Sequence, residues 1–415
     1  MGSTTCSDLQ TSSLSKKGCV PPHPNLRAEI WSLRCKELTY PVDFPVVMRA
    51  VVFESFGEPA IREVRRPTPE DESVLLSVSR VQLSITECWL YRGREVLGHD
   101  SVKELIDRGD GRLFGHEFCG EVVEVGESVS SLDIGDRVFA PGPVPCGSCQ
   151  YCASDSTDLC ADRAIIGMDR PGALAEYVTL PESALQRLPD GVSDVEGAAM
   201  QPVATALVDV LDADVSTGDV VVTIGAGVMG NHCGQLALHQ GADAVFALDI
   251  RPEIVELANT HGLEGINTDR TDPTERILER TAEMGADVVF EAVGGPHDHT
   301  SEGDDPLTQA LRLVRMGGTI VQVGIIPGEM TMSPLAFQHN SVSWVNGRDL
   351  AGSIRTGPNS TTSKTAVEMV RSDRVSISEF VSHEREGLKS IEEAVDITMQ
   401  KDEFGALGPA QIVLD

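Results

Sequence analysis

Residues 219–241, DVVVTIGAGVMGNHCGQLALHQG, decide the fold of the second half of this chain. An apolar run ends in glycines, and the residues that follow it have the hydrophobic spacing of a helix. A second apolar run, AVFALDI, follows at 244–250. Strand, helix and strand in this order predict a βαβ unit, in which a helix crosses over the sheet to join two parallel strands.

The same alternation continues toward the C-terminus. Helical stretches lie at 252–262 and 306–315. Strand-like apolar runs lie at 286–295, 317–324 and 341–347. Repeated βαβ units build a parallel sheet with helices on both faces. We therefore expect a doubly wound α/β domain over residues 206–346.

The first half has a different pattern. Between residues 48 and 205, short β-rich runs are broken by Gly, Pro and Asp, which is typical of a barrel-like or strongly bent sheet domain. The segment 347–415 has two helical stretches and ends in the strand-like run AQIVLD, so we expect it to return to this first domain. Residues 1–47 are rich in Ser, Thr and Pro without a period, and we expect a disordered tail or an extension upstream of the true start.

The chain of 415 residues carries a formal charge of −31 at pH 7, from 33 Lys and Arg against 64 Asp and Glu. Such a surface repels nucleic-acid phosphates and anionic lipid, so neither is an expected partner. The acidic excess is also typical of proteins that stay soluble in concentrated salt, and a halophilic source is a hypothesis. No apolar run approaches the ~18 residues that cross a membrane, and no secretory signal is recognisable, so we expect a cytoplasmic protein.

The glycines of the opening stretch match G-x-G-x-x-G at the end of a strand and the start of a helix. The first glycine permits a tight turn, the second lets the backbone approach a pyrophosphate, and the third allows the helix to pack closely on the strand. Asp249 ends the next strand, where a carboxylate accepts hydrogen bonds from an adenosine ribose and repels a 2′-phosphate. We predict NAD as the cofactor, while Arg251 leaves NADP open. The predicted cofactor residues in this region are Gly225, Gly227, Val228, Met229, Gly230, Asp249 and Arg251.

A second motif is the run CGSCQYCASDSTDLC at 146–160, with C-x2-C-x2-C-x7-C spacing. Four thiolates this close in sequence can complete a tetrahedral shell around one zinc ion and leave no position open for water or substrate. The site is therefore predicted to be structural rather than catalytic. A disulfide framework is the alternative, although a chain of this size needs no such staples. The predicted ligands are Cys146, Cys149, Cys152 and Cys160.

The cysteine loop follows a Gly-His-Glu motif at 115–117 and precedes the G-x-G-x-x-G domain. Together with Gly-Asp-Arg-Val at 135–138, Thr205, and VGIIPG at 323–328, this order resembles the zinc-containing medium-chain alcohol and polyol dehydrogenase family over residues 48–415.

The resemblance implies a β-rich GroES-like catalytic domain, over 48–205 and 347–415, and a Rossmann domain over 206–346. It also implies an active site in the cleft and assembly as a homodimer or homotetramer. The implied reaction is hydride transfer between the carbinol carbon of a small-molecule alcohol and nicotinamide, with a second zinc polarising the oxygen.

In this family the second zinc is held by a Cys from a C-G-T-D segment, the His of Gly-His-Glu, and a Cys or Glu just before the nucleotide domain. Here Ser84 occupies the first cysteine position and Gln201 the last, while His116 survives with Glu117 beside it. Serine hydroxyls and side-chain amides are poor zinc ligands, so the resemblance implies that zinc is held weakly or is lost at this second site.

Other residues follow from the same alignment. Thr86 matches the hydroxyl that contacts the substrate oxygen in the family, and Thr205 matches a residue beside the nicotinamide. Trp89 stands where many members have the histidine that passes the alcohol proton to solvent. Cys88 lies four residues past Ser84, and on a continuing extended segment its side chain does not simply replace the ligand. Cys88 then binds zinc only through a local register shift, and the alternative is a buried core thiol.

Three functions remain open at this point. The first is an NAD(H)-dependent dehydrogenase or reductase of a secondary alcohol, polyol or sugar, in which His116 and Glu117 bind or support a catalytic metal. The second is a reductase without the catalytic zinc, which stabilises oxyanion charge with hydroxyl and backbone donors. The third is a catalytically silent NAD-binding sensor or scaffold. Zinc content and turnover distinguish them.

Overall fold

The computed structural model describes residues 47–154, 156–295, 305–326, 334–346 and 361–414. The chain from Val46 to Asp415 forms one compact unit with two large sheets and a two-stranded ribbon. The expected tail lies outside the described residues apart from Val47. The first strand begins there, one residue before the expected start.

A six-stranded parallel sheet forms in the second half, in the spatial order β10-β9-β8-β11-β12-β13. The strand order reverses between β8 and β11, and doubly wound folds bind their ligands at such a switch point. The predicted doubly wound sheet is therefore confirmed. Its strands are β8 (Val220–Ile224), β9 (Ala244–Asp249), β10 (Glu264–Asn267), β11 (Ala286–Glu291), β12 (Val314–Gln322) and β13 (Ser343–Asn346).

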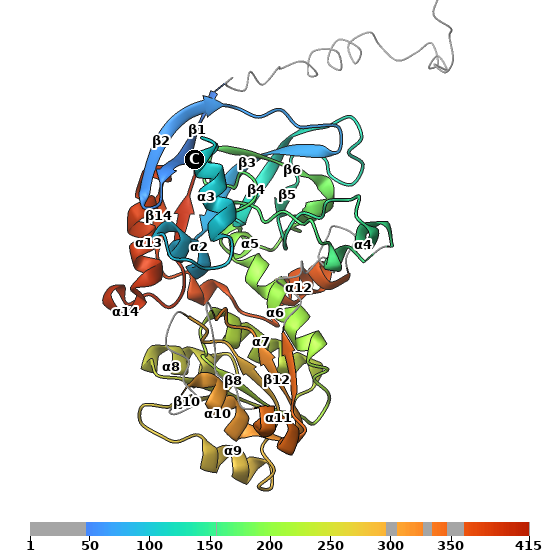
Figure 1. Ribbon diagram of the computed structural model, residues 1–415, viewed down its shortest axis with the longest axis vertical. Helices are drawn as coiled ribbons and strands as arrows, with labels where there is room; N and C mark the ends of the chain where they lie inside the picture. Colours follow the sequence, from blue (N-terminus) through green and yellow to red (C-terminus); the bar gives the residue numbers. More distant parts are fainter. Residues whose placement is uncertain (1–46, 155, 296–304, 327–333, 347–360, 415) are drawn as a thin grey trace, which may run out of the picture. The chain divides into compact units, whose positions relative to one another are not determined.

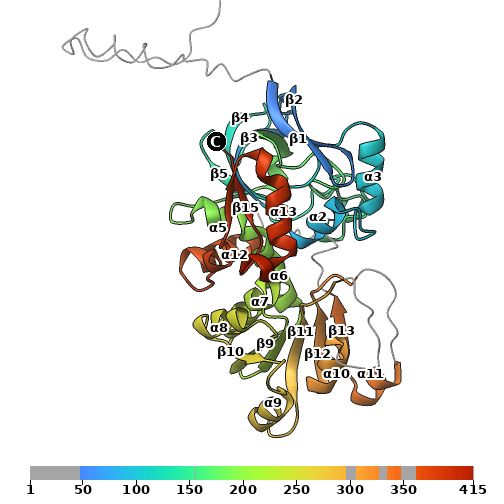
Figure 2. The same cartoon turned by 90° about the vertical axis from the view of Figure 1, so that its left-hand side faces the viewer.

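Every residue of β8 is buried, because helices cover both faces of this sheet. Val221 packs in one core with apolar residues of α7, whereas Val220 and Val222 pack in a second core with apolar residues of α10. The two helices therefore cover opposite faces (Figure 2). The helices of this half are α7 (Val228–Gln240), α8 (Pro252–Thr260), α9 (Thr274–Arg280), α10 (Pro306–Leu313) and α11 (Pro334–Asn340).

The first half forms a seven-stranded, mostly antiparallel sheet in the order β14-β15-β3-β4-β5-β7, with β6 paired to β3. Gln411 of β15 pairs with Gln82 of β3, so the last strand of the chain lies in the same sheet as strands of the first half. The strands are β1 (Val47–Ser55), β2 (Glu58–Arg65), β3 (Ser73–Gln82), β4 (Glu117–Val125), β5 (Arg137–Phe139), β6 (Tyr177–Pro181), β7 (Gln186–Arg187), β14 (Glu384–Glu386) and β15 (Gln411–Val413). Of these, β1 and β2 form the separate ribbon.

Helix α6 (Met200–Asp212) leads from this sheet to β8 and is almost entirely buried (Figure 1). The expected domain boundary between residues 205 and 206 falls inside it. The other helices are α2 (Ile85–Tyr91), α3 (His99–Asp107), α4 (Gln150–Ala153), α5 (Asp194–Ala198), α12 (Thr361–Arg371), α13 (Ile391–Met399) and α14 (Lys401–Phe404), with 3-10 turns at Thr157–Leu159, Glu182–Ala184, Ser378–Phe380 and Leu388–Ser390. Within the described ranges, no helix has the length and apolar character needed to cross a membrane.

The start of α2 corrects one expectation. The chain does not continue as an extended segment past Ser84, because Ser84 and Glu87 form a capping box. The Ser84 hydroxyl accepts a hydrogen bond from the Glu87 N–H at 3.2 Å, and the Glu87 carboxylate accepts one from the Ser84 N–H at 3.4 Å. Ser-x-x-Glu is a recognisable helix start, so the sequence contained this signal.

Candidate active site

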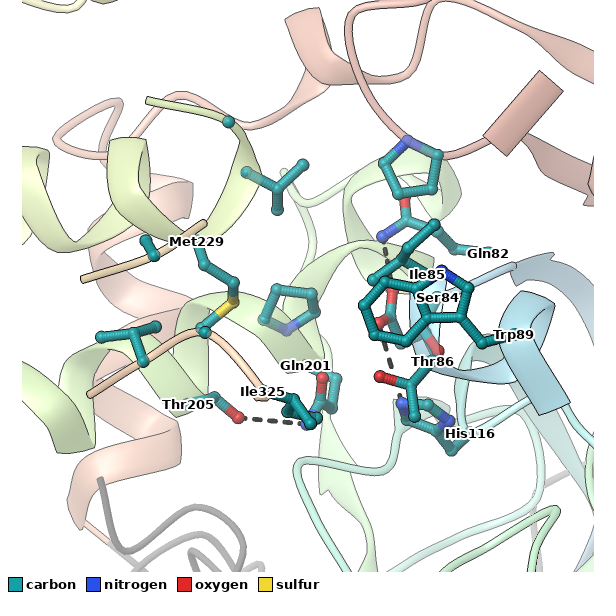
Figure 3. A pocket seen from close by; sticks show the side chains of 18 of the residues that line it. Gln82, Ser84, Ile85, Thr86, Trp89, His116, Gln201, Thr205, Met229 and Ile325 are labelled. Carbon is teal, nitrogen blue, oxygen red and sulfur yellow. Dashed lines mark hydrogen bonds and ion pairs between the residues drawn. The ribbon is translucent and has the colours of Figure 1, made fainter. Parts of the chain in front are cut away.

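A cavity of about 680 Å³ lies where the carboxyl ends of the parallel strands meet the elements of the first half. Figure 3 shows Ser84, Thr86, Trp89 and His116 at one end of it and Met229 at the other. The predicted residues that line it are Ser84, Thr86, His116, Glu117, Gln201, Thr205, Gly227, Val228, Met229, Asp249 and Arg251. Gly225 and Gly230 do not line the wall.

The glycine loop has the geometry that its pattern predicts. Gly225 has a φ of +84°, which disfavours any residue with a side chain. A Cβ on Gly230 would lie 1.8 Å from the Gly225 carbonyl oxygen, so only glycine lets α7 pack this closely. A Cβ on Gly227 would meet nothing within 4 Å, and no side chain caps this end of α7. The N-terminus of a 13-residue helix therefore faces open space in the cavity, as an anion-binding site requires.

Asp249 and Arg251 stand beside this loop. One Asp249 oxygen accepts a hydrogen bond from the Ala226 N–H and the other from the Arg251 N–H, each at 2.9 Å. Burial raises the pKa of Asp249, against these hydrogen bonds, which lower it. The Arg251 guanidinium contacts the Glu253 carboxylate at 2.6 Å and the Asp402 carboxylate at 2.7 Å. Arg251 is thus already paired with carboxylates.

His116 is held by a residue that sequence reasoning missed. Its Nδ1 lies 2.8 Å from Glu87 Oε1, which also accepts hydrogen bonds from the N–H groups of Gly115 at 2.7 Å and His116 at 3.2 Å. Burial opposes the charge on His116, but the Glu87 carboxylate outweighs it and raises the His116 pKa to about 9. Burial raises the pKa of Glu87, but the charge and hydrogen bonds of His116 outweigh burial, so the pKa is lowered. Glu87 stands at the aspartate position of the C-G-T-D segment, and this was the signal available in the sequence.

Glu117 lies on the other side of the same ring. Its Oε1 is 3.7 Å from His116 Nε2, too far for a direct hydrogen bond, and its Oε2 accepts a hydrogen bond from Gln82 Nε2 at 2.5 Å. Burial raises the Glu117 pKa to about 7. His116 Nε2 therefore faces the cavity without a close partner, near a carboxyl group that titrates close to neutral pH.

The four predicted zinc ligands of the cysteine run come together. Their sulfur atoms all lie within 4.8 Å of one another, and all four are free cysteines rather than disulfides. The N–H of Cys149 donates to Cys146 Sγ, and the N–H of Cys146 donates to Cys160 Sγ, each at 3.3 Å. Such N–H groups stabilise thiolates, and those of Ser148 and Cys149 lower the Cys146 pKa to about 6. This arrangement fits a tetrahedral zinc ion.

Two family models match this chain, the alcohol dehydrogenase GroES-like domain over residues 70–190 and the zinc-binding dehydrogenase domain over residues 228–372. The chain is 32% identical to the probable D-xylulose reductase A of Aspergillus terreus, over 71% of this chain and 80% of that protein. The chain belongs to the zinc-containing medium-chain alcohol dehydrogenase family. It is an NAD(P)-dependent oxidoreductase of the class that acts on CH–OH groups.

Other relatives of this dehydrogenase agree. It is 31% identical to the L-threonine 3-dehydrogenase of Coxiella burnetii, over 66% of this chain and 75% of that protein. The solved structure of an alcohol dehydrogenase from Thermus sp. ATN1 is 27% identical, with a TM-score of 0.72, over 89% of this chain and 100% of that one. The expected GroES-like and Rossmann folds are confirmed.

The donor atoms of this dehydrogenase do not fit a second zinc. Ser84 Oγ is used to cap α2, and Gln201 Nε2 donates to Thr205 Oγ1 at 3.1 Å. Cys88 is fully buried, does not line the cavity, and has a pKa raised by burial. His116 Nε2 is left with Glu117 and weak oxygen donors, whereas zinc sites use several nitrogen or sulfur ligands. In the described part of the chain, the cysteine cluster is the only group of three or more Cys, His, Asp or Glu that brings its ligand atoms this close.

Proposed function

We propose that this dehydrogenase interconverts a small secondary alcohol, polyol or sugar and its carbonyl with NAD(H), and that the cysteine cluster binds one structural zinc. The observation that carries the proposal is the shared cavity. It is lined by the open Gly227 loop of the cofactor-binding fold and by the polar side chains of Thr86 and His116. The hydride donor must meet the carbonyl carbon, and polar side chains must meet the carbonyl oxygen, within one such cavity.

The chain's own residues then have distinct roles. The Thr86 hydroxyl and His116 Nε2 contact the substrate oxygen, and Glu87 fixes the ring of His116 through Nδ1. Glu117, near Nε2, accepts or returns a proton as its carboxyl group titrates. Thr205 lies beside the nicotinamide, which supplies or accepts the hydride when bound.

The donor set around His116 favours the form of this function that uses no catalytic zinc. Hydrogen bonds from Thr86 and from protonated His116 would stabilise charge on the substrate oxygen in place of the metal. Metal analysis and activity test the proposal together. We expect one zinc per chain, and oxidation of NADH in the presence of at least one class of ketone or ketose. Two zinc ions per chain would contradict the zinc-free active site. NAD binding without turnover across alcohols, polyols and carbonyls would favour a silent NAD-binding protein.

The cofactor preference gives a prediction at Asp249. Its carboxylate repels a 2′-phosphate, and Arg251 is already paired with Glu253 and Asp402, so we propose NAD over NADP. Asp249→Asn keeps a carbonyl oxygen as acceptor but removes the charge. It is expected to narrow the preference for NADH over NADPH by about tenfold or more, measured as the ratio of Kd values.

The matched control for this change is Asp269→Asn, at an exposed position outside the cavity lining. It should leave the ratio of the two Kd values unchanged. An unaltered ratio in Asp249→Asn would show that the carboxylate does not set the preference.

A further inference from the structure

The cavity has few cationic side chains to balance the negative charge of a bound dinucleotide. Among the described residues of its wall are four carboxylic acids, whereas the only lysine or arginine side chains among them are Arg251 and Lys401. The acidic residues are Glu117, Asp249, Asp402 and Glu403. A dinucleotide brings a doubly charged pyrophosphate into this space. Its negative charge must be offset by the N-terminus of α7 and by any cation that is not already paired.

Arg251 is already committed. Its Nη2 lies 2.6 Å from Glu253 Oε1 and donates to the Ala406 carbonyl oxygen at 2.9 Å, and its Nε lies 2.7 Å from Asp402 Oδ1. Moving this guanidinium to a new anion would break two ion pairs and a hydrogen bond. Arg251 is therefore a poor candidate for binding the phosphates.

Lys401, unlike Arg251, is not engaged in an ion pair with any described residue. Within the described ranges, no hydrogen bond or ion pair of its ammonium group is found. Burial lowers its pKa, as does the charge of the nearby Arg251, whereas the Asp402 carboxylate raises it. The thiol of Cys88 is also near, but burial keeps that thiol neutral by raising its pKa. Asp402 itself contacts Arg251 rather than Lys401. A partly buried ammonium group with no direct ion pair or hydrogen bond costs free energy, which a bound anion offsets.

A series of contacts links the segment that carries Lys401 to the cofactor loop. The Ala226 N–H donates to Asp249, the Arg251 N–H donates to the same carboxylate, and the Arg251 side chain contacts Asp402, the neighbour of Lys401. The Ala406 N–H donates to the Lys401 carbonyl oxygen at 2.8 Å, which fixes the turn at α14.

From these observations we propose that Lys401 binds the pyrophosphate of the dinucleotide, opposite the N-terminus of α7. This inference rests on the proposed use of NAD(H). The same ammonium group would suit a phosphate or carboxylate carried by the substrate, so the experiment must separate the two sources.

The test measures the Kd of three ligands for Lys401→Met, Lys401→Arg and the unaltered protein. NADH and ADP-ribose both carry the pyrophosphate, whereas adenosine carries no phosphate. Lys401→Met is expected to weaken NADH and ADP-ribose by about ten- to a hundredfold and to leave adenosine unchanged, while Lys401→Arg keeps most of the affinity. Added salt should weaken ADP-ribose binding less in Lys401→Met than in the unaltered protein. Lys389→Met, at an exposed position on the same C-terminal segment, is the control.

Three results would overturn the proposal. Unchanged binding of NADH and ADP-ribose by Lys401→Met, with a raised KM for the carbonyl substrate alone, would assign the lysine to an anionic substrate. An equal loss for adenosine would show a structural role. Failure of the unaltered protein to bind NADH or ADP-ribose would overturn the proposed function itself, which distinguishes that failure from the failure of Lys401 alone.

Discussion

Replacement of Cys146 by serine is expected to abolish zinc binding at the cysteine cluster and to lower the Tm by on the order of 10 °C. The reason lies in what else holds the loop. From residue 146 to residue 159, no described side chain is buried, and α4 buries none of its residues. A loop without its own apolar core depends on the metal for its fold.

The measurements are zinc per chain by elemental analysis, thermal unfolding, and the rate of proteolytic cleavage within 146–160. Ser154→Ala is the control, because Ser154 lies in the same loop and bonds only to the Tyr151 carbonyl oxygen through its side chain. It should keep one zinc and the unaltered Tm. A Cys146→Ser protein that retains a full equivalent of zinc and an unchanged Tm would show that the cluster does not bind a structural metal.

The parts of this protein that the sequence predicts well are those with local geometry. The glycine loop is predictable because Gly225, Gly227 and Gly230 lie within one turn between a strand and a helix, so their spacing alone determines their surroundings. The cysteine cluster is equally local, since its sulfur atoms come from one loop. In both cases the chain has little freedom to place these residues elsewhere.

The surroundings of His116 were not predictable in the same way. Its partner Glu87 is 29 positions earlier in the sequence and reaches the ring only because the capping box at Ser84 turns the chain into α2. Gln82, which bonds to Glu117, is placed by the pairing of β3 with β4. Lys401 enters the cavity from a segment more than 150 residues beyond the glycine loop. Such contacts depend on tertiary packing, which spacing does not report.

The pairing of His116 with Glu87 carries the second large prediction. His116→Gln is expected to lower kcat/KM by about a hundredfold or more, because it removes the proposed charged hydrogen-bond donor to the substrate oxygen. Glu87→Gln keeps the shape of the partner but removes its charge. The pKa of His116, raised to about 9 in the unaltered protein, should then fall, because burial disfavours the imidazolium once its carboxylate is gone. The alkaline limb of the pH–rate profile for carbonyl reduction should move to lower pH.

The same pair predicts the pH dependence of stability. The folded-state pKa of His116 lies above its ordinary value of 6.5, so its contribution is complete below that pH and is lost as the pH rises through about 9. A shift of this size corresponds to about 3 kcal/mol of unfolding free energy. Glu117 faces the same ring, and its folded-state pKa is raised from 4.5 to about 7. Its titration therefore lowers the unfolding free energy at lower pH, as the pH rises from about 4.5 to about 7.

Denaturant unfolding between pH 6.5 and 9.5 tests this, with His339→Gln as the control because His339 is exposed on α11. The control should lose stability toward pH 9.5 as the unaltered protein does, whereas His116→Gln should lack the loss that centres above pH 7. If His116→Gln keeps both the alkaline loss of stability and the unaltered kcat/KM, the Glu87–His116 pair neither holds the proton nor takes part in the reaction.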